Sequence, residues 1–289
     1  MKLLILGASG MLGNSLLRWF AERSSFDVYG SVRNYESIKV LNAYAPNAEI
    51  IADIDVENLD SLTRLFAQIK PDVVINCIGI IKQLAEADDP LTAIPINALL
   101  PHRLVRLSQL AGARLIHVST DCVFSGEKGG YLESDPPDAK DLYGRSKLIG
   151  EVDYENAITL RTSIIGHELN SAHGLVEWFL SQVEPVHGFS KAVFSGLPTV
   201  ELARVIDQYV LPHPELRGLY HVSADPIDKY SLLKLLANAY GCKVKVIHDD
   251  KFVIDRSLNS ERFRNATCYQ PPTWSDLVKR MRDFKDLPR

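Results

Sequence analysis

The stretch Lys2-Leu3-Leu4-Ile5-Leu6-Gly7-Ala8-Ser9-Gly10-Met11-Leu12-Gly13 decides the fold of this 289-residue chain. A short apolar run predicts a buried strand, and it leads through three glycines into an amphipathic stretch that predicts a helix. Gly7 permits a tight turn, Gly10 lets a pyrophosphate approach the backbone, and Gly13 lets the helix pack closely on the strand. The free N–H groups and positive dipole end of that helix favour an anion. The stretch therefore predicts a dinucleotide-binding turn.

The same alternation continues through the first half of the chain. Apolar runs predict strands at 2–6, 28–32, 49–52, 73–76, 114–118 and 158–160, and amphipathic stretches predict helices at 11–22, 59–69, 101–111 and 144–155. Continuous apolar strands joined by helical crossovers are typical of a parallel sheet that is covered on both faces. Right-handed crossovers then make it a doubly wound Rossmann-type α/β sheet.

After about residue 165 the alternation loosens, and prolines and glycines interrupt it. This half predicts helices at 175–182, 200–209, 230–239 and 274–284, with strands at 219–222 and 243–248. We expect residues 1–165 to form the dinucleotide-binding domain and residues 166–289 to form a smaller C-terminal α/β lobe. The lobe should lie over the carboxyl edge of the sheet and bind substrate, with some segments returning to the first domain.

Composition excludes several classes of protein. Charged residues make up 24% of the chain and the formal net charge is −4, so no basic surface for nucleic acid is expected. The four cysteines show no metal-like spacing, which favours reduced thiols and no metal site. The apolar run at the start is too short for a secretion signal, and no 18-residue apolar span follows. We therefore expect a cytoplasmic protein with no membrane partner.

Three strand ends suggest how the cofactor is selected. An NAD-preferring site carries an acid at the end of the second strand, whereas that strand here ends at Arg33. Arg33 could clamp a 2′-phosphate, which favours NADPH with NADH as the alternative; a solvated surface arginine is the competing interpretation. Asp53, followed by Ile54, could accept a hydrogen bond from the adenine, or serve only as a turn residue. Gly79 after the fourth strand allows close approach of the backbone.

Two clusters carry candidate chemistry. Thr120 comes just after the predicted strand at 114–118. Tyr143 and Lys147 lie four residues apart on one face of the next helix. A free phenol has a pKa near ~10, and a neighbouring ammonium favours its phenolate. The pair could thus exchange a proton with a carbonyl oxygen to which Thr120 also donates. A Tyr-x-x-x-Lys pattern alone is weak, since surface pairs also produce it. Its position at the same sheet edge as the glycine turn favours catalysis.

Longer strings resemble a known family. They are STDCVFSG (119–126), YLESD (131–135), LYGRSKLIGE (142–151), LRTS (160–163), GLPT (196–199) and GLYHVS (218–223). With the glycine turn, they resemble the extended short-chain dehydrogenase/reductases, and within them the dTDP-4-dehydrorhamnose reductase group. The resemblance covers nearly the whole chain.

The resemblance implies NADPH-dependent reduction of a 4-keto-6-deoxy nucleotide sugar in surface-polysaccharide biosynthesis. Thr120 would polarise the carbonyl, Tyr143 would give the proton, and Lys147 would hold the cofactor and tune Tyr143. The residues expected to contact the cofactor are Gly7, Ser9, Gly10, Met11, Leu12, Gly13, Arg33, Asp53, Ile54, Cys77, Ile78, Gly79, Asn97, Ser119, Tyr143, Lys147, Thr162 and Ser163.

The expected substrate contacts are Asp121, Cys122, Trp178 and Arg256. Cys122 departs from the resembled group, which usually has a tyrosine at this position. The absence of a second acid after Asp121 argues against a dehydratase. Arg256 resembles the family's late arginine and would face the diphosphate, although a surface role has equal weight. His167, His173 and Trp178 follow the sixth strand, where the cleft should open; packing is an equal alternative for Trp178. His221 is expected to be structural.

Two other functions compete with the reductase. A nucleotide-sugar epimerase would use the same threonine, tyrosine and lysine but retain its NAD(P). A non-catalytic regulatory subunit would bind the dinucleotide as a structural ligand, although the retention of Thr120, Tyr143 and Lys147 counts against it. The expected partner is a small-molecule nucleotide sugar, and a homodimer is allowed.

Overall fold

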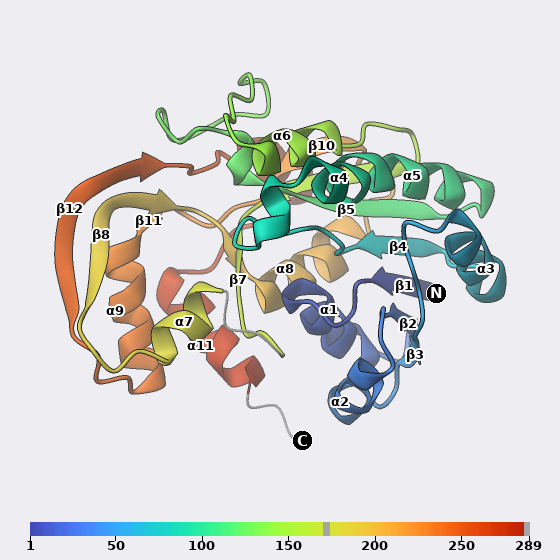
Figure 1. Cartoon of the computed structure of the whole chain (residues 1–289), viewed down its shortest axis with the longest axis horizontal. Helices are drawn as coiled ribbons and strands as arrows, with labels where there is room; N and C mark the ends of the chain where they lie inside the picture. The colour runs from blue at the N-terminus through green and yellow to red at the C-terminus, as the bar shows by residue number, and fades with distance from the viewer. Residues whose placement is uncertain (170–173, 286–289) are drawn as a thin grey trace.

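A computed structural model describes residues 1–169 and 174–285. Its centre is a seven-stranded sheet in the order β10-β6-β5-β4-β1-β2-β3, in which every pair of neighbours is parallel (Figure 1). The strands are β1 (Lys2–Leu6), β2 (Asp27–Ser31), β3 (Glu49–Ile51), β4 (Val73–Asn76), β5 (Arg114–Thr120), β6 (Ala157–Thr162) and β10 (Gly218–His221). The strand order reverses between β1 and β4, which confirms the doubly wound α/β fold.

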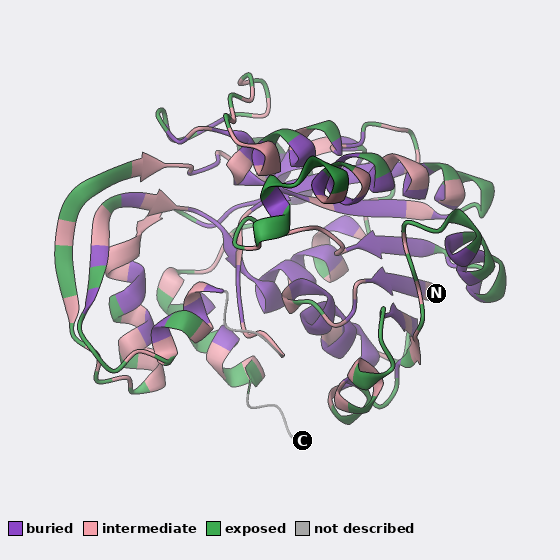
Figure 2. Ribbon diagram, in the orientation of Figure 1, coloured by how far each residue is buried: buried purple, intermediate pink, exposed green. Residues whose placement is uncertain are grey.

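Alternation of side chains along each strand builds a core on both faces of the sheet. In β1, Leu3 and Ile5 belong to one cluster of buried residues, whereas Leu4 and Leu6 belong to another. The first face is covered by α1 (Met11–Ala21), α2 (Glu36–Tyr44) and α8 (Thr199–Val205). The second is covered by α3 (Leu59–Ile69) and α5 (Leu100–Leu110). The central strands are therefore buried almost throughout (Figure 2).

The helix that carries the candidate tyrosine is shorter than predicted. Helix α6 spans Leu142–Ile149 instead of 144–155, and it begins where the Asp141 carboxylate accepts from the Gly144 N–H at 2.7 Å. Its C-terminal end packs closely on another segment, since a Cβ on Gly150 would lie 1.9 Å from the Asn97 carbonyl oxygen. Asn97 belongs to a π-helix at Ile94–Leu99, which follows the short α4 (Pro90–Ala93).

The second lobe is built on a curved arm of strands (Figure 1). The central strand β8 (Val186–Phe194) pairs parallel with β12 (Val246–Asp255) and antiparallel with β11 (Ile227–Asp228). Strand β8 was not predicted, and β12 begins later and runs further than the predicted strand at 243–248. The lobe also contains α7 (Leu175–Leu180), α9 (Lys229–Tyr240), α11 (Trp274–Lys285) and the short pair β7 (Ile164–Ile165) and β9 (Leu197–Pro198).

The two halves of the sequence interleave in space. Strand β10 pairs with β6 at the edge of the central sheet, and α8 packs on α1. Helix α10 (Glu261–Thr267) packs against β10. The segment from α8 to β10 therefore packs with the elements of the first domain, although it follows residue 165. Within the described ranges, every helix is too short or too polar to span a membrane.

Candidate active site

The turn after β1 has the geometry that its glycines predict. Gly7 has φ of +79°, and a Cβ there would lie 2.9 Å from the Ile78 Cγ1 atom. A Cβ on Gly13 would lie 2.1 Å from the Gly7 carbonyl oxygen, so only glycine at position 13 lets α1 approach β1 this closely. A Cβ on Gly10 would meet only that oxygen, at 3.5 Å. The chain thus leaves room at the N-terminus of α1, and this opening fits a dinucleotide pyrophosphate.

The side chains around this turn differ in what they offer. Leu12 is buried in the core, so only its backbone could contact a cofactor. Ser9 and Met11 are half-buried. A Cβ on Gly174 would lie 2.8 Å from the Met11 Cε atom. Met11 therefore borders the segment that enters the second lobe.

The adenine end of the predicted site is a rim formed by the segments after β2 and β3. The Ile54 N–H donates to the Val32 carbonyl at 3.2 Å, which brings the two segments together. Asp53 has φ of +61°, a conformation that costs a non-glycine residue about 1 kcal/mol or more. Arg33 and Asp53 are both exposed, and the described residues give Arg33 no hydrogen bond or ion pair. Both side chains are therefore free to meet a ligand.

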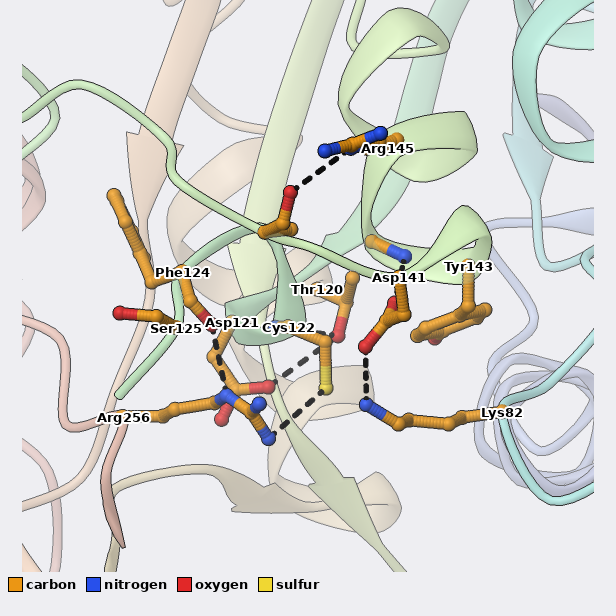
Figure 3. Close-up of polar contacts among 12 residues, drawn as sticks. Lys82, Thr120, Asp121, Cys122, Phe124, Ser125, Asp141, Tyr143, Arg145 and Arg256 are labelled. Atoms are coloured by element: carbon orange, nitrogen blue, oxygen red, sulfur yellow. Dashed lines mark hydrogen bonds and ion pairs between the residues drawn. The ribbon is translucent and has the colours of Figure 1, made fainter. Parts of the chain in front are cut away.

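Thr120 and Tyr143 lie near each other at the carboxyl end of β5 (Figure 3), and Lys147 reaches the same strand from α6. The Thr120 hydroxyl donates to Asp121 Oδ1 at 3.3 Å and accepts from the Cys122 N–H at 3.1 Å, and Tyr143 lies on the next helix beside it. Burial raises the pKa of the Tyr143 phenol above its usual range. The Lys147 ammonium donates to the Val118 carbonyl at 2.9 Å. Burial lowers the pKa of Lys147 to about 8, while Glu151 opposes that effect. The group can therefore present a protonated phenol beside a cation.

Asn97 organises the backbone next to Lys147. Its amide accepts from the Ile80 N–H at 2.9 Å and donates to the Ile80 carbonyl at 3.2 Å and to the Ser146 hydroxyl at 3.3 Å. A Cβ on Gly79 would lie 3.3 Å from the Asn97 Oδ1 atom and 3.8 Å from the Lys147 Nζ atom. The structure therefore places Asn97 behind the loop from Cys77 to Ile80, where it positions the loop.

Ser119 is directed away from Thr120, since neighbouring residues of a strand face opposite sides. Its hydroxyl donates to Glu151 Oε1 at 2.7 Å, and Glu151 forms a bidentate ion pair with Arg161 at 2.8 and 2.6 Å. Arg161 is fully buried and also bonds His221 at 2.8 Å. The Ser119 side chain therefore belongs to a buried network that sequence reasoning missed, although its members stand in the resembled strings.

The strand end after β6 contributes two further predicted residues. Thr162 is buried, and its hydroxyl donates to the Ser163 carbonyl at 3.2 Å. The Ser163 side chain is a polar neighbour of Asp121 and counteracts the rise in the pKa of that carboxyl. Both residues therefore lie at the same sheet edge as Thr120.

Asp121, Cys122 and Arg256, three of the predicted substrate contacts, lie close together (Figure 3). The Arg256 Nε–H donates to the Phe124 carbonyl at 2.8 Å, and its Nη1 atom lies 3.9 Å from the Cys122 thiol. Burial raises the pKa of Asp121 to about 6, although Arg256 opposes the shift. Lys82, which was not predicted, pairs with Asp141 at 2.6 Å; only its position after the fourth strand could have indicated it.

The remaining lobe candidates do not join this group. Trp178 lies on α7 with 38% exposure, and no described hydrogen bond or ring contact links it to Tyr143. His167 bonds Glu177 and, at 2.7 Å, the Tyr240 hydroxyl, so it is held inside the lobe. His173 lies outside the described residues. His221 is buried in the Arg161 network, as a structural role requires. Across the described residues, no three His, Cys, Asp or Glu side chains gather as metal ligands.

The parallel sheet, the glycine turn after β1 and the Thr120–Tyr143–Lys147 group together define an extended short-chain dehydrogenase/reductase. The chain belongs to the RmlD substrate binding domain family, whose model matches residues 1–284.

Named relatives differ in what they do. The chain is 30% identical to the spore coat polysaccharide biosynthesis protein SpsK of Bacillus subtilis, over 96% of this chain and 89% of that protein. It is 29% identical to methionine adenosyltransferase 2 subunit beta of Xenopus tropicalis, over 83% of this chain and 72% of that protein.

Solved structures share the fold. A dTDP-4-dehydrorhamnose reductase of Bacillus anthracis in complex with NADP is 23% identical, with a TM-score of 0.78 over 98% of this chain and 97% of that one. A UDP-glucose 4-epimerase of Thermotoga maritima is 18% identical, with a TM-score of 0.81 over 99% and 98%. At this level of identity the likeness concerns the fold alone.

Proposed function

We propose that this chain is an NADPH-dependent reductase of a 4-keto-6-deoxy nucleotide sugar, with NADH as the alternative cofactor and a cytoplasmic role in surface-polysaccharide biosynthesis. The observation that carries the proposal is the position of Tyr143 near Thr120 at the carboxyl end of β5, with the buried Lys147 one turn further along α6. A protein of Burkholderia thailandensis that is named dTDP-4-dehydrorhamnose reductase supports it, at 32% identity over 53% of this chain.

The proposed mechanism follows from the positions of these side chains. The nicotinamide cofactor supplies the hydride when it is bound. The open backbone at Gly10 and the N-terminus of α1 hold the pyrophosphate, and Lys147 holds the ribose hydroxyls. Thr120 and Tyr143 both donate to the substrate carbonyl oxygen, which orients it and offsets its developing negative charge. Tyr143 then transfers its proton to that oxygen, and the Lys147 ammonium stabilises the phenolate that remains.

The test is NADPH oxidation, followed at 340 nm, against a panel of 4-keto-6-deoxy nucleotide sugars. We expect Tyr143→Phe to lower kcat at least about 100-fold, since general acid catalysis contributes roughly 10²–10⁴-fold, and to leave NADPH affinity unchanged. Tyr35→Phe, at a side chain that is 71% exposed, is the matched control and should keep full activity. Absence of oxidation with every panel member would overturn the proposal. Cofactor that stays bound through gel filtration would instead favour an epimerase.

A second candidate function is that of a regulatory subunit. It is favoured by the 29% identity to methionine adenosyltransferase 2 subunit beta. In this role the dinucleotide would serve as a structural ligand, and the Tyr143 proton would not be used. Adding the chain to a methionine adenosyltransferase would then change that enzyme's activity, and Tyr143→Phe would produce the same change as the unaltered chain.

A further inference from the structure

The Thr120 hydroxyl has its single proton committed to a neighbouring side chain. It donates that proton to Asp121 Oδ1 at 3.3 Å, and its oxygen accepts from the Cys122 N–H at 3.1 Å (Figure 3). A threonine hydroxyl has one proton and two acceptor lone pairs. In this arrangement Thr120 can accept one more hydrogen bond, but it has no proton left for a carbonyl oxygen. The proposed mechanism, however, needs Thr120 as a donor to that oxygen.

A proton on the Asp121 carboxyl reverses the direction of this hydrogen bond. A carboxylate can only accept hydrogen bonds, whereas a carboxylic acid also has an O–H group that donates. The acid can donate to the remaining lone pair of the Thr120 oxygen while the Cys122 N–H occupies the other. The Thr120 proton is then free to point at a substrate carbonyl. The charge of Asp121 therefore decides whether Thr120 can act as a donor.

The surroundings of Asp121 bring its titration close to neutral pH. The carboxyl is buried, and this burial raises its pKa to about 6. Arg256 opposes the rise, but its guanidinium is held by the Phe124 carbonyl, to which Nε–H donates at 2.8 Å. The other polar and titratable groups that act on the carboxyl come from four elements: Thr120 and Cys122 beside it, Ser163 after β6, Tyr143 on α6 and Lys229 on α9.

We propose that Asp121 is a positioning residue that directs the Thr120 proton, and that Thr120 polarises the substrate carbonyl only when Asp121 is protonated. This inference rests on the proposed function and assigns to Asp121 a role other than the substrate contact that the resemblance implies. Asp121 acts through Thr120 and gives no proton to the substrate. Tyr143 remains the proton donor of the reaction.

The first readout is the pH profile of kcat/KM for NADPH oxidation, measured with the nucleotide sugar of the panel that is turned over fastest. The value should fall as the pH rises through about 6, because the protonated form of Asp121 is then lost. Loss of the Lys147 ammonium adds a separate fall near pH 8. At pH 7 only about one molecule in ten carries the Asp121 proton.

Asp121→Asn separates this role from its alternatives. The amide has the shape of the neutral acid and offers Thr120 an N–H donor at every pH. The variant should therefore lose the fall near pH 6 and gain up to about tenfold in kcat/KM at pH 7. An acid that only contacts substrate or supports the fold would lose activity instead. The matched control is Asp138→Asn, an exposed carboxylate that accepts from the Ser125 N–H and hydroxyl at 2.6 Å each, and it should leave the profile unchanged.

Substitutions at Thr120 test whether Asp121 acts through the hydroxyl. Thr120→Ser keeps the hydroxyl and should keep the fall near pH 6. Thr120→Val removes the hydroxyl, so its residual activity should show no fall at that pH. Persistence of the fall in Asp121→Asn or in Thr120→Val would overturn the inference, as would a folded Asp121→Asn variant with a lower kcat/KM at every pH.

A titration without turnover covers the case in which Asp121→Asn does not fold. In carbon-13 NMR of the aspartate carboxyl groups, the signal with a midpoint near 6 should move to higher pH in Thr120→Val, because Thr120 lowers the pKa of Asp121. An unmoved midpoint would refute the coupling between the two side chains. A midpoint that depends on Thr120, in a protein that oxidises no NADPH with any panel member, would refute the reductase but not the coupling.

Discussion

Replacing Glu151 by glutamine should destabilise the protein strongly, because it leaves a buried guanidinium without its counter-ion. The Arg161 side chain is 2% exposed and Glu151 is 11% exposed, so solvent screens the pair very little. Glu151 accepts two bonds from Arg161 and one from Ser119. Removing one partner of such a pair costs about 3–5 kcal/mol. With an m-value of about 3 kcal/mol/M, the urea midpoint should fall by about 1 to 1.7 M.

The assay is urea unfolding of Glu151→Gln at pH 7, with Glu127→Gln as the control. Glu127 pairs with Lys140 on the surface at 3.1 Å, where both side chains are at least 75% exposed, so its loss should matter little. Because Glu151 raises the pKa of Lys147, the folded variant should also lose activity at a lower pH than the unaltered protein. The reasoning is wrong if the two variants unfold at the same urea concentration.

Three further predictions concern the cofactor site. The pKa of Lys147 is about 8, so kcat/KM for NADPH oxidation should fall as the pH rises through that value and the ammonium is lost. Lys147→Arg should flatten this alkaline limb of the pH profile, and an unchanged limb would contradict the assignment. Arg33→Ala should raise the KM for NADPH about tenfold and leave the KM for NADH unchanged, and Lys39→Ala is the control. Equal effects on the KM values for both cofactors would count against a 2′-phosphate contact. Gly13→Ala should weaken NADPH binding at least about tenfold and lower Tm, because the alanine Cβ would lie 2.1 Å from the Gly7 carbonyl oxygen. An unaltered Kd for NADPH would refute the close packing of α1.

Local signals in the sequence determined the central sheet and the catalytic candidates. The β1 turn could be predicted because steric demands within a few residues set it, as the positive φ of Gly7 illustrates. Helix α3 was predicted at its observed bounds, since its apolar period lies within one segment and Asn58 caps it. The four-residue spacing of Tyr143 and Lys147 likewise needs only helical geometry.

Contacts between distant segments decided the rest. The end of α6 packs where Gly150 meets Asn97, a residue from another segment. Arg161 is held by Glu151 and by His221, sixty residues away, and no local pattern encodes that pairing. The strand β8 was missed because its pairing partners, β11 and β12, lie far along the chain. The sequence alone therefore determined the elements whose pattern is local, whereas the tertiary structure decided the pairing of β8 and which charges meet, because both depend on distance in space.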